Sequence, residues 1–173
     1  MKKAFISLVI LVAIGVAGYY LVKNGGVDVI CSEHTPHEWE TKNQPDMWKA
    51  QAGTPGIQET LPVLITGWIK RYGKNNIEEG LKRIAQYCAR NPAEIFKFTT
   101  KGAIEKGKDA DLVIVDIDTP WKVQKKDLFS KCGWSAYEGM KLFGRPEQVF
   151  LRGVSVYNKG TIVEDPKGKW LGH

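Results

Sequence analysis

A carboxylate and two imidazoles lie close together in the first quarter of the chain, at Glu33, His34 and His37. A carboxylate can bind a metal ion or accept a proton, and an imidazole can bind a metal ion or hydrogen-bond an anionic substrate. They follow β-branched residues at 27–31 that predict a strand, and catalytic groups of α/β barrels lie at the carboxyl ends of strands. The spacing alone is weakly specific, so a loop without a ligand stays open as the alternative.

A long polar segment follows these residues. Residues 32–54 contain two histidines, two tryptophans and two prolines, and they show no apolar periodicity. A connection of this length is uncommon in a compact domain, so the segment is either functional or disordered. It leads into the turn-forming residues Gly53, Thr54, Pro55 and Gly56.

Two helices are predicted after this segment. Apolar residues recur at helical spacing over residues 57–69. Asn76 can cap a second helix, with Glu79 as the partner in a capping box. This second helix is expected to end at residues 90–92, where a short helix through Phe96 can begin.

Beyond Gly102, short apolar runs replace the helical periodicity. Strands are predicted at 112–115, 148–151 and 154–157, and a turn at 158–160 leads to a further strand at 161–163. We therefore expect three parts: an apolar helix over 1–23, a strand, loop and helices over 24–100, and a small β-rich part over 101–173.

The net charge of +6 does not indicate a nucleic-acid partner. Lys2, Lys3 and Lys23 lie in the first 23 residues, which contain no acidic residue. In the remaining residues, lysines and arginines exceed acidic residues by only three, and the two kinds are interleaved, as in 105–109. Interleaved charges are typical of a solvated mixed surface, so nucleic acid is excluded as a partner.

The first 23 residues need a separate interpretation, because 19 consecutive residues from Ala4 to Val22 carry no charge. As a helix this run would reach ~28 Å, close to the ~30 Å hydrocarbon thickness of a bilayer. Lysines flank it, and Tyr19 and Tyr20 suit a membrane interface, so we expect a membrane-anchoring helix over 4–22. A cleaved secretory signal, an apolar helix buried in a partner and an unrelated upstream extension stay open, as does the orientation.

The three cysteines, Cys31, Cys88 and Cys132, form no Cys-x-x-Cys pair. Their odd number leaves at least one thiol unpaired. Reduced, mostly buried thiols are therefore expected, which fits a cytoplasmic environment better than an oxidising one.

Residues 27–37 resemble the Asp-Val-Ile-x-Ser-Asp-His-Ala-Pro-His segment of dihydroorotases, which belong to the amidohydrolase superfamily. The resemblance covers essentially all of residues 24–173, in order, and is carried by 53–59, 91–96, 101–114, 133–139 and 152–157. The Gly-x-Asp-Ala-Asp-Leu-Val element is typical of the superfamily's small β domain. The Pro-His ending and the Gly-Trp-Ser block favour dihydroorotase or allantoinase over hydantoinase.

The resemblance implies roles for six residues and a zinc cofactor. Glu33 stands where the family has an aspartate that binds the metal and moves the proton of a bridging hydroxide. His37 stands at the position that helps to bind the substrate carboxylate, and residues 53–56 match backbone contacts to the substrate ring. Glutamate adds one methylene at position 33, and a displacement of ~1 Å in a catalytic group can lower the rate ~100-fold.

The resemblance also implies an incomplete fold. The family's metal site needs a His-x-His pair, a carboxylated lysine or equivalent acid, and two more histidines, but this chain has three histidines in all. A (β/α)8 barrel takes ~250 residues. The expected fold is therefore α/β: the last strand and helices of a TIM-like amidohydrolase barrel, followed by a small β-rich domain. A complete set of zinc ligands is not expected from this chain alone, and two explanations of the missing barrel stay open: a partner chain supplies it, or it was lost by truncation.

Three functions are open. The first is a fragment of a dihydroorotase-like, metal-dependent cyclic-amide hydrolase, which interconverts carbamoyl-aspartate and dihydroorotate in pyrimidine biosynthesis. The second is a membrane-anchored, non-catalytic relative that binds a partner through the open barrel face. The third is an allantoinase-type hydrolase. The chain is expected at a membrane if residues 4–22 are an anchor, and otherwise in the cytoplasm, as for the family.

Overall fold

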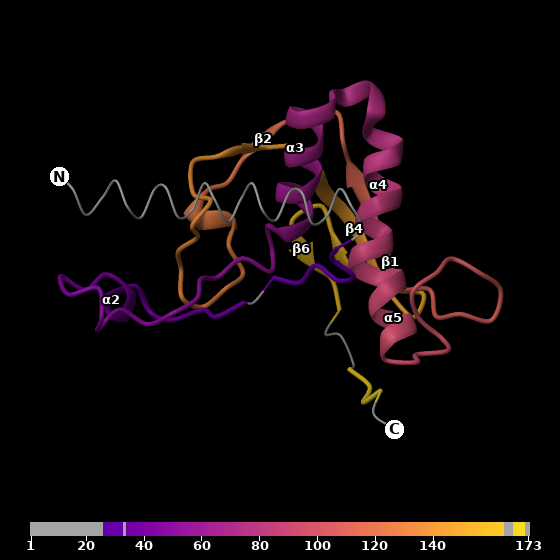
Figure 1. Ribbon diagram of the computed structural model, residues 1–173, viewed down its shortest axis with the longest axis horizontal. Helices are drawn as coiled ribbons and strands as arrows, with labels where there is room; N and C mark the ends of the chain where they lie inside the picture. Colours follow the sequence, from indigo (N-terminus) through magenta and orange to yellow (C-terminus); the bar gives the residue numbers. More distant parts are fainter. Residues whose placement is uncertain (1–25, 33, 165–167, 172–173) are drawn as a thin grey trace. The chain divides into compact units, whose positions relative to one another are not determined.

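The computed structural model describes residues 26–32, 34–164 and 168–171, and Figure 1 shows its helices and strands. The chain divides into two compact units, residues 1–30 and residues 31–173. Within the described residues, no helix is long and apolar enough to cross a membrane. The predicted apolar helix over 1–23, including the expected anchor at 4–22, lies outside the described residues.

The strand predicted at 27–31 is not formed. These residues have no regular secondary structure, and no β-ladder includes them. A strand is held by hydrogen bonds to the strand beside it, so a β-branched run alone does not make one. The first backbone pairing that follows is an isolated parallel bridge between His34 and Thr54.

A short helix, α2 (Trp39–Lys42), interrupts the polar segment. None of its residues is buried. The sequence gives no signal for this helix, because a single turn without a buried residue has no apolar face and hence no apolar periodicity.

The two predicted helices are confirmed. α3 runs over Thr60–Tyr72, and the short 3-10 helix η1 (Lys74–Asn76) connects it to α4 (Ile77–Ala85). α3 and α4 contact each other (Figure 1). The glycine at position 80 permits this contact, because a Cβ at Gly80 would lie 2.6 Å from Cδ1 of Trp68.

The capping box predicted at the start of α4 is not formed. Nδ2 of Asn76 donates to the carbonyl of Tyr72 at 2.8 Å, and no side chain caps α4. The carboxylate of Glu79 accepts a hydrogen bond from Nε of Arg83 at 2.8 Å. Both side chains therefore bind a residue four positions away, where neighbours on a helix face meet.

The short helix predicted to begin at residues 91–92 is confirmed by α5 (Asn91–Ile95), but no break in the helical path separates it from α4. The chain continues from α4 through a π-helical turn, η2 (Gln86–Arg90), into α5 (Asn91–Ile95). A proline has no N–H, and its ring crowds the carbonyl four residues earlier. Pro92 lies in the first turn of α5, and the π turn before it lets the helical path continue instead of ending.

Four antiparallel strands form one sheet in the order β1-β4-β5-β6. Their bounds are β1 Leu112–Asp116, β4 Arg145–Leu151, β5 Val154–Asn158 and β6 Thr161–Ile162. The strands predicted in this part of the sequence are confirmed. β4 begins earlier than predicted because Arg145 pairs with Asp116 at the end of β1.

A second antiparallel pair joins β2 (Trp121–Lys122) to β3 (Lys141–Leu142), and the 3-10 helix η3 (Lys125–Asp127) lies between them in sequence. β3 contacts α3. The backbone N–H of Phe143 donates to Oγ1 of Thr66 at 2.8 Å, which ties the chain after β3 to the middle of α3.

The core lies where α3 meets this second pair. Ile65 is completely buried, and Val123 and Leu142 are each 1% exposed. Gly144 lies against this core, since a Cβ there would come 2.5 Å from Cδ1 of Ile65. Ile65 comes before residue 100 and Val123 and Leu142 come after it, so the parts of the chain before and after residue 100 share this core. The domain boundary that we predict near residue 100 stays a prediction.

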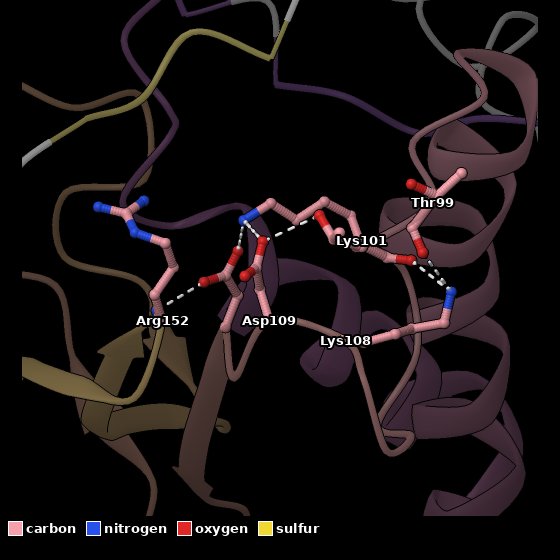
Figure 2. Close-up of polar contacts among 7 residues, drawn as sticks. Thr99, Lys101, Lys108, Asp109 and Arg152 are labelled. Atoms are coloured by element: carbon pink, nitrogen blue, oxygen red, sulfur yellow. Dashed lines mark hydrogen bonds and ion pairs between the residues drawn. The ribbon is translucent and has the colours of Figure 1, made fainter.

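An ion-pair network joins the segment after α5 to the sheet (Figure 2). Nζ of Lys101 contacts the carboxylates of both Asp109 and Asp111. Asp111 also accepts the backbone N–H of Arg152 at 2.8 Å, and Asp109 accepts the hydroxyl of Thr100 at 3.0 Å. One lysine therefore holds two aspartates that lie just before β1.

Candidate functional site

The two sequence segments assigned to the site lie side by side. The backbone N–H of Thr35 donates to the carbonyl of Thr54 at 3.2 Å, next to the parallel bridge between His34 and Thr54. This pairing places residues 34–37 alongside residues 53–56. The long polar segment between them is therefore a loop whose two ends meet.

The side chain of His34 fixes the second segment. Its Nδ1 accepts the backbone N–H of Gly56 at 3.2 Å and that of Ile57 at 3.4 Å. A ring nitrogen that accepts hydrogen bonds carries no proton, so the neutral ring has its proton on Nε2. His34 thus holds the turn with one nitrogen and retains one N–H donor.

Gly53 lies where the two segments are closest. Its φ is +82°, a conformation that residues with a Cβ rarely adopt, and a Cβ there would lie 1.7 Å from Oγ1 of Thr35. Nζ of Lys42 donates to the carbonyl of Gly53 at 2.6 Å and to that of Gln51 at 2.7 Å. The last residue of α2 thereby holds the end of the loop.

Two tryptophans hold the first segment. Nε1 of Trp134 donates to the carbonyl of His37 at 2.8 Å. The ring of Trp39 meets that of Trp134 edge-on, with 5.4 Å between the ring centroids. Because Trp134 lies in the Gly-Trp-Ser block, that block positions His37 through its backbone.

Gln58 connects the turn before α3 to the segment after η3. Its Nε2 donates to the carbonyl of Asp127 at 2.8 Å, and its Oε1 accepts the N–H of Phe129 at 2.9 Å. An amide side chain presents an NH2 group that donates and a carbonyl oxygen that accepts, so Gln58 satisfies both backbone groups at once.

A cavity of about 660 Å³ lies beside these residues. Its walls come from residues 55–59 with His34, from residues 126–130, and from β4, β5 and β6. Trp121 and Trp134 complete the lining. The volume is within the range of small-molecule binding sites.

Two residues of this wall bury polar atoms without a partner in the described chain. Glu59 is 2% exposed, and its Oε1 accepts no hydrogen bond there. Nε1 of Trp121 is likewise buried and donates to no described atom. The guanidinium carbon of Arg145 lies 5.6 Å from the centre of the Trp121 ring. An unpaired buried polar group is unfavourable by about 1–3 kcal/mol, so these atoms need an explanation.

The predicted site residues are placed as follows. Glu33 lies outside the described residues. His37 is half-buried with its carbonyl bound by Trp134, and Pro55 and Gly56 are buried in the turn that His34 holds. The assigned catalytic and substrate-binding roles stay predictions.

Sequence reasoning missed the residues that hold the site. The signals for His34 and Trp134 were present in the histidine motif and the Gly-Trp-Ser block, but their hydrogen-bond partners are distant in sequence. No local signal marks Lys42 or Gln58, because a lysine in a polar segment and a glutamine before a helix are ordinary residues at those positions.

A metal centre does not form from the described residues alone. Among them, no group of three or more His, Cys, Asp or Glu side chains could hold a metal ion. Nδ1 of His34 is already occupied by two backbone N–H groups. The residues therefore do not fit the zinc site that the resemblance implies, unless Glu33 and ligands from outside the described chain complete it.

Comparisons with known proteins agree with the fold. The family model described as "Amidohydrolase family" matches residues 61–163. A dihydroorotase of Halobacterium salinarum is 34% identical over 140 residues, which cover 80% of this chain and 31% of the relative. An allantoinase of Desulfitobacterium hafniense is 36% identical over 148 residues, covering 86% of this chain and 32% of the relative. The solved structure of an L-hydantoinase from Arthrobacter aurescens superimposes with a TM-score of 0.75 at 30% identity, covering 84% of this chain and 32% of that one.

This chain therefore spans about a third of the length of the curated relatives that it matches. The relatives include hydantoinases as well as dihydroorotases and allantoinases. The three kinds of relative have similar sequence identities to this chain, from 32% to 36%. The identities therefore do not test the preference for dihydroorotase or allantoinase that the Pro-His ending and the Gly-Trp-Ser block indicate.

Proposed function

This chain belongs to the amidohydrolase family, and from that premise we propose that it contributes the substrate-facing loops of a dihydroorotase-type cyclic amidohydrolase. The observation that supports the proposal is the pairing of residues 34–37 with residues 53–56. The family motif assigns a proton-transfer carboxylate and a substrate-carboxylate ligand to the first segment, and ring contacts to the second. Both would face a single bound substrate.

In this proposal the second segment binds the ring of a cyclic amide. A turn that contains glycine lets backbone groups approach a ligand closely. His34 keeps this turn in place through Gly56 and Ile57. His37 supplies an imidazole N–H to a substrate carboxylate, and Trp134 fixes the backbone that carries it. Glu33 moves the proton of the attacking water, as its position in the motif implies.

In this proposal, the described residues of this chain are not sufficient for the activity of the whole enzyme. The donors among the described residues do not make a metal site by themselves. The proposed contribution of this chain is to bind and orient the substrate ring and to hold a carboxylate at position 33.

The proposal is tested by co-expression. The full chain is produced together with the part of the Pyrococcus furiosus dihydroorotase that precedes its match to this chain. We expect the purified mixture to interconvert carbamoyl-aspartate and dihydroorotate in the presence of zinc. Glu33→Gln should lower the rate at least ~100-fold, because general acid–base catalysis contributes ~10²–10⁴-fold. Glu33→Asp, which restores the family residue, should retain the activity.

The matched control is the same upstream part co-expressed with its own C-terminal third. If that pair is active and the mixture with this chain forms no product, the proposed activity is wrong. Equal rates for the mixtures that contain the unmodified chain and the Glu33→Gln variant would show that Glu33 has no role in the reaction.

An allantoinase-type activity is the second candidate. The observation that favours it is the 36% identity to a protein named allantoinase, which is higher than the 34% identity to the dihydroorotase above. Assaying the mixture with allantoin in parallel separates the two activities. Turnover of allantoin without turnover of dihydroorotate would select the second candidate.

A further inference from the structure

The single turn α2 lies in sequence between the two segments of the candidate site, and its first and last residues contact both. At its start, the ring of Trp39 meets the ring of Trp134, whose Nε1 donates to the carbonyl of His37 at 2.8 Å. At its end, Nζ of Lys42 donates to the carbonyl of Gly53 at 2.6 Å. α2 therefore connects the backbone of the first segment to the backbone of the second.

The backbone of α2 sets the position from which the Lys42 side chain extends. The N–H of Lys42 donates to the carbonyl of Glu38 at 3.2 Å. The hydroxyl of Thr41 donates to the same carbonyl at 2.8 Å. Trp39 and Lys42 are three positions apart, and residues at this spacing lie on one side of a helical turn. One turn thus presents an aromatic ring and an ammonium group to two segments that lie alongside each other.

The ammonium group of the half-buried Lys42 is held by neutral acceptors. Besides the carbonyl of Gly53, it binds the carbonyl of Gln51 at 2.7 Å. The N–H of Gln51 in turn donates to the carbonyl of Thr41 at 3.3 Å. Within the described ranges of the chain, no carboxylate forms an ion pair with Lys42. A charged donor makes hydrogen bonds about twice as strong as a neutral one, so the charge of Lys42 matters for this contact.

We propose that Lys42 is a positioning residue, which holds the turn at residues 53–56 at the distance from His37 that a cyclic substrate needs. This inference rests on the proposed function, because it takes residues 53–56 as the ring-binding turn and His37 as the ligand of the substrate carboxylate. A ligand that contacts two segments binds more tightly when the distance between them is fixed before it arrives. Lys42 acts through the carbonyl of Gly53 and does not itself contact the substrate.

The test measures ligand affinity and not turnover. The full chain is titrated with dihydroorotate, and the backbone N–H signals of Gly56 and Ile57 are followed by nuclear magnetic resonance. Lys42→Met removes the ammonium group and keeps an unbranched side chain, and it should raise the Kd by about 10-fold. Lys42→Arg keeps the charge and has N–H donors for both carbonyls, so its Kd should return to within about three-fold of the original.

A second measurement follows the two segments without a ligand. The N–H of Thr35 donates to the carbonyl of Thr54, so its hydrogen exchange reports on their pairing. This exchange should be faster in Lys42→Met and should return to the original rate in Lys42→Arg. If Lys42→Met does not fold, as judged by circular dichroism, Lys42→Gln takes its place, since glutamine is neutral and polar.

Lys49→Met is the matched control. Lys49 is an exposed lysine in the same polar segment. Exposed charges are screened by salt, so this variant should keep the Kd to within about two-fold. The exchange rate at Thr35 should also stay unchanged in this variant.

The outcomes separate the positioning role from the proposed activity. Weaker binding and faster Thr35 exchange in Lys42→Met, both recovered in Lys42→Arg, support the positioning role. If the co-expressed mixture is then inactive, only the proposed activity is wrong. An equal Kd for Lys42→Met and the unmodified chain overturns the positioning role, even if the mixture is active. Weaker binding that Lys42→Arg does not recover also overturns it, as does an unmodified chain that binds no dihydroorotate.

Discussion

Thr35 and Gly53 touch so closely that only a glycine fits: a Cβ at Gly53 would lie 1.7 Å from Oγ1 of Thr35. The same contact brings residues 34–37 against residues 53–56. The hydroxyl of Thr35 is buried without a hydrogen-bond partner in the described chain, so steric fit and not a polar contact determines this approach.

Gly53→Ala should therefore destabilise the chain for two separable reasons. The φ of +82° disfavours alanine by about 1–2 kcal/mol, and forcing the methyl against Thr35 adds about 1–3 kcal/mol. Urea unfolding measures the sum. Gly107→Ala is the matched control, since Gly107 has a φ of +92° and no atom within 4 Å of its Cβ position. If the two variants lose the same free energy of unfolding, the steric contact contributes nothing.

A second substitution isolates the contact further. In a Thr35→Gly background, Gly53→Ala should lose only what Gly107→Ala loses, because the hydroxyl and methyl of Thr35 are gone. A double-mutant cycle of the four variants then gives the interaction between positions 35 and 53 directly. A coupling near zero would contradict the close approach.

His34→Ala should free the turn that follows Pro55. Nδ1 of His34 accepts the N–H groups of Gly56 and Ile57, and removing the acceptor should speed hydrogen exchange at these two amides by about 10-fold, the equivalent of ~1.4 kcal/mol. His34→Asn should restore part of the protection, because its Oδ1 lies close to the position of Nδ1. His34→Gln extends further and should not. Equal exchange rates at the Gly56 and Ile57 amides in all four proteins would mean that the His34 side chain does not stabilise the turn.

Gln58→Glu should remove one of the two hydrogen bonds that the Gln58 side chain makes. The carboxylate still accepts the N–H of Phe129 but can no longer donate to the carbonyl of Asp127. We expect a loss of about 1–3 kcal/mol in unfolding free energy, with the amide of Phe129 still protected from exchange. Gln58→Ala should lose both the stability and the protection. Exchange at Phe129 that is unchanged in Gln58→Ala would contradict the contact.

Local patterns predicted the elements whose stability is local. The apolar period over 57–69 predicted α3, and the apolar run at 154–157 predicted β5, which pairs with β4 just before it in sequence. A helix contains its own hydrogen bonds, and a hairpin pairs strands that are close in sequence. Periodicity therefore suffices for these elements.

The errors arise where a distant group decides the structure. Residues 27–31 have the composition of a strand but no ladder partner, and composition cannot report that absence. Asn76 has an acceptor in the previous helix end, so it does not cap α4. Pro92 is accommodated by the π turn before it and so does not end the helix.

The motif predicted two segments that lie side by side, but not what holds them; their role as a functional site stays a prediction. Residues 33–37 and 53–56 were assigned together, and the structure places the described ones side by side. The residues that fix them, Lys42, Gln58 and Trp134, act through contacts to backbone groups. A contact to a backbone group does not depend on the residue type of its partner, so the partner cannot be identified from the sequence.

The ion-pair network around Lys101 should make stability depend on pH at both extremes. The hydrogen bond from Lys101 lowers the pKa of Asp109, with help from Thr100. Burial raises the pKa of Asp111, but the hydrogen bonds from Lys101 and the Arg152 N–H outweigh it, so this pKa is also lowered. The hydrogen bond to Asp111 raises the pKa of Lys101.

Carboxylates with a lowered pKa stabilise the fold above the ordinary aspartate pKa of ~3.9, and this contribution is lost as the pH falls through the lower folded value. A lysine with a raised pKa stabilises the fold fully below ~10.4, and this contribution is lost as the pH rises through the higher folded value. The network should therefore act between about pH 4 and pH 10.

Lys101→Met tests this window. Its melting temperature should be lower than that of the unmodified chain at pH 7, and the difference should shrink as the pH falls below ~3.9 towards the lowered folded pKa values of the two aspartates. Lys106→Met is the matched control, because Lys106 is an exposed lysine in the same segment and lies outside the network drawn in Figure 2. That variant should follow the unmodified chain throughout this pH range. A pH-independent difference for Lys101→Met would show that the side chain acts by packing, and that its charge contributes nothing to holding Asp109 and Asp111.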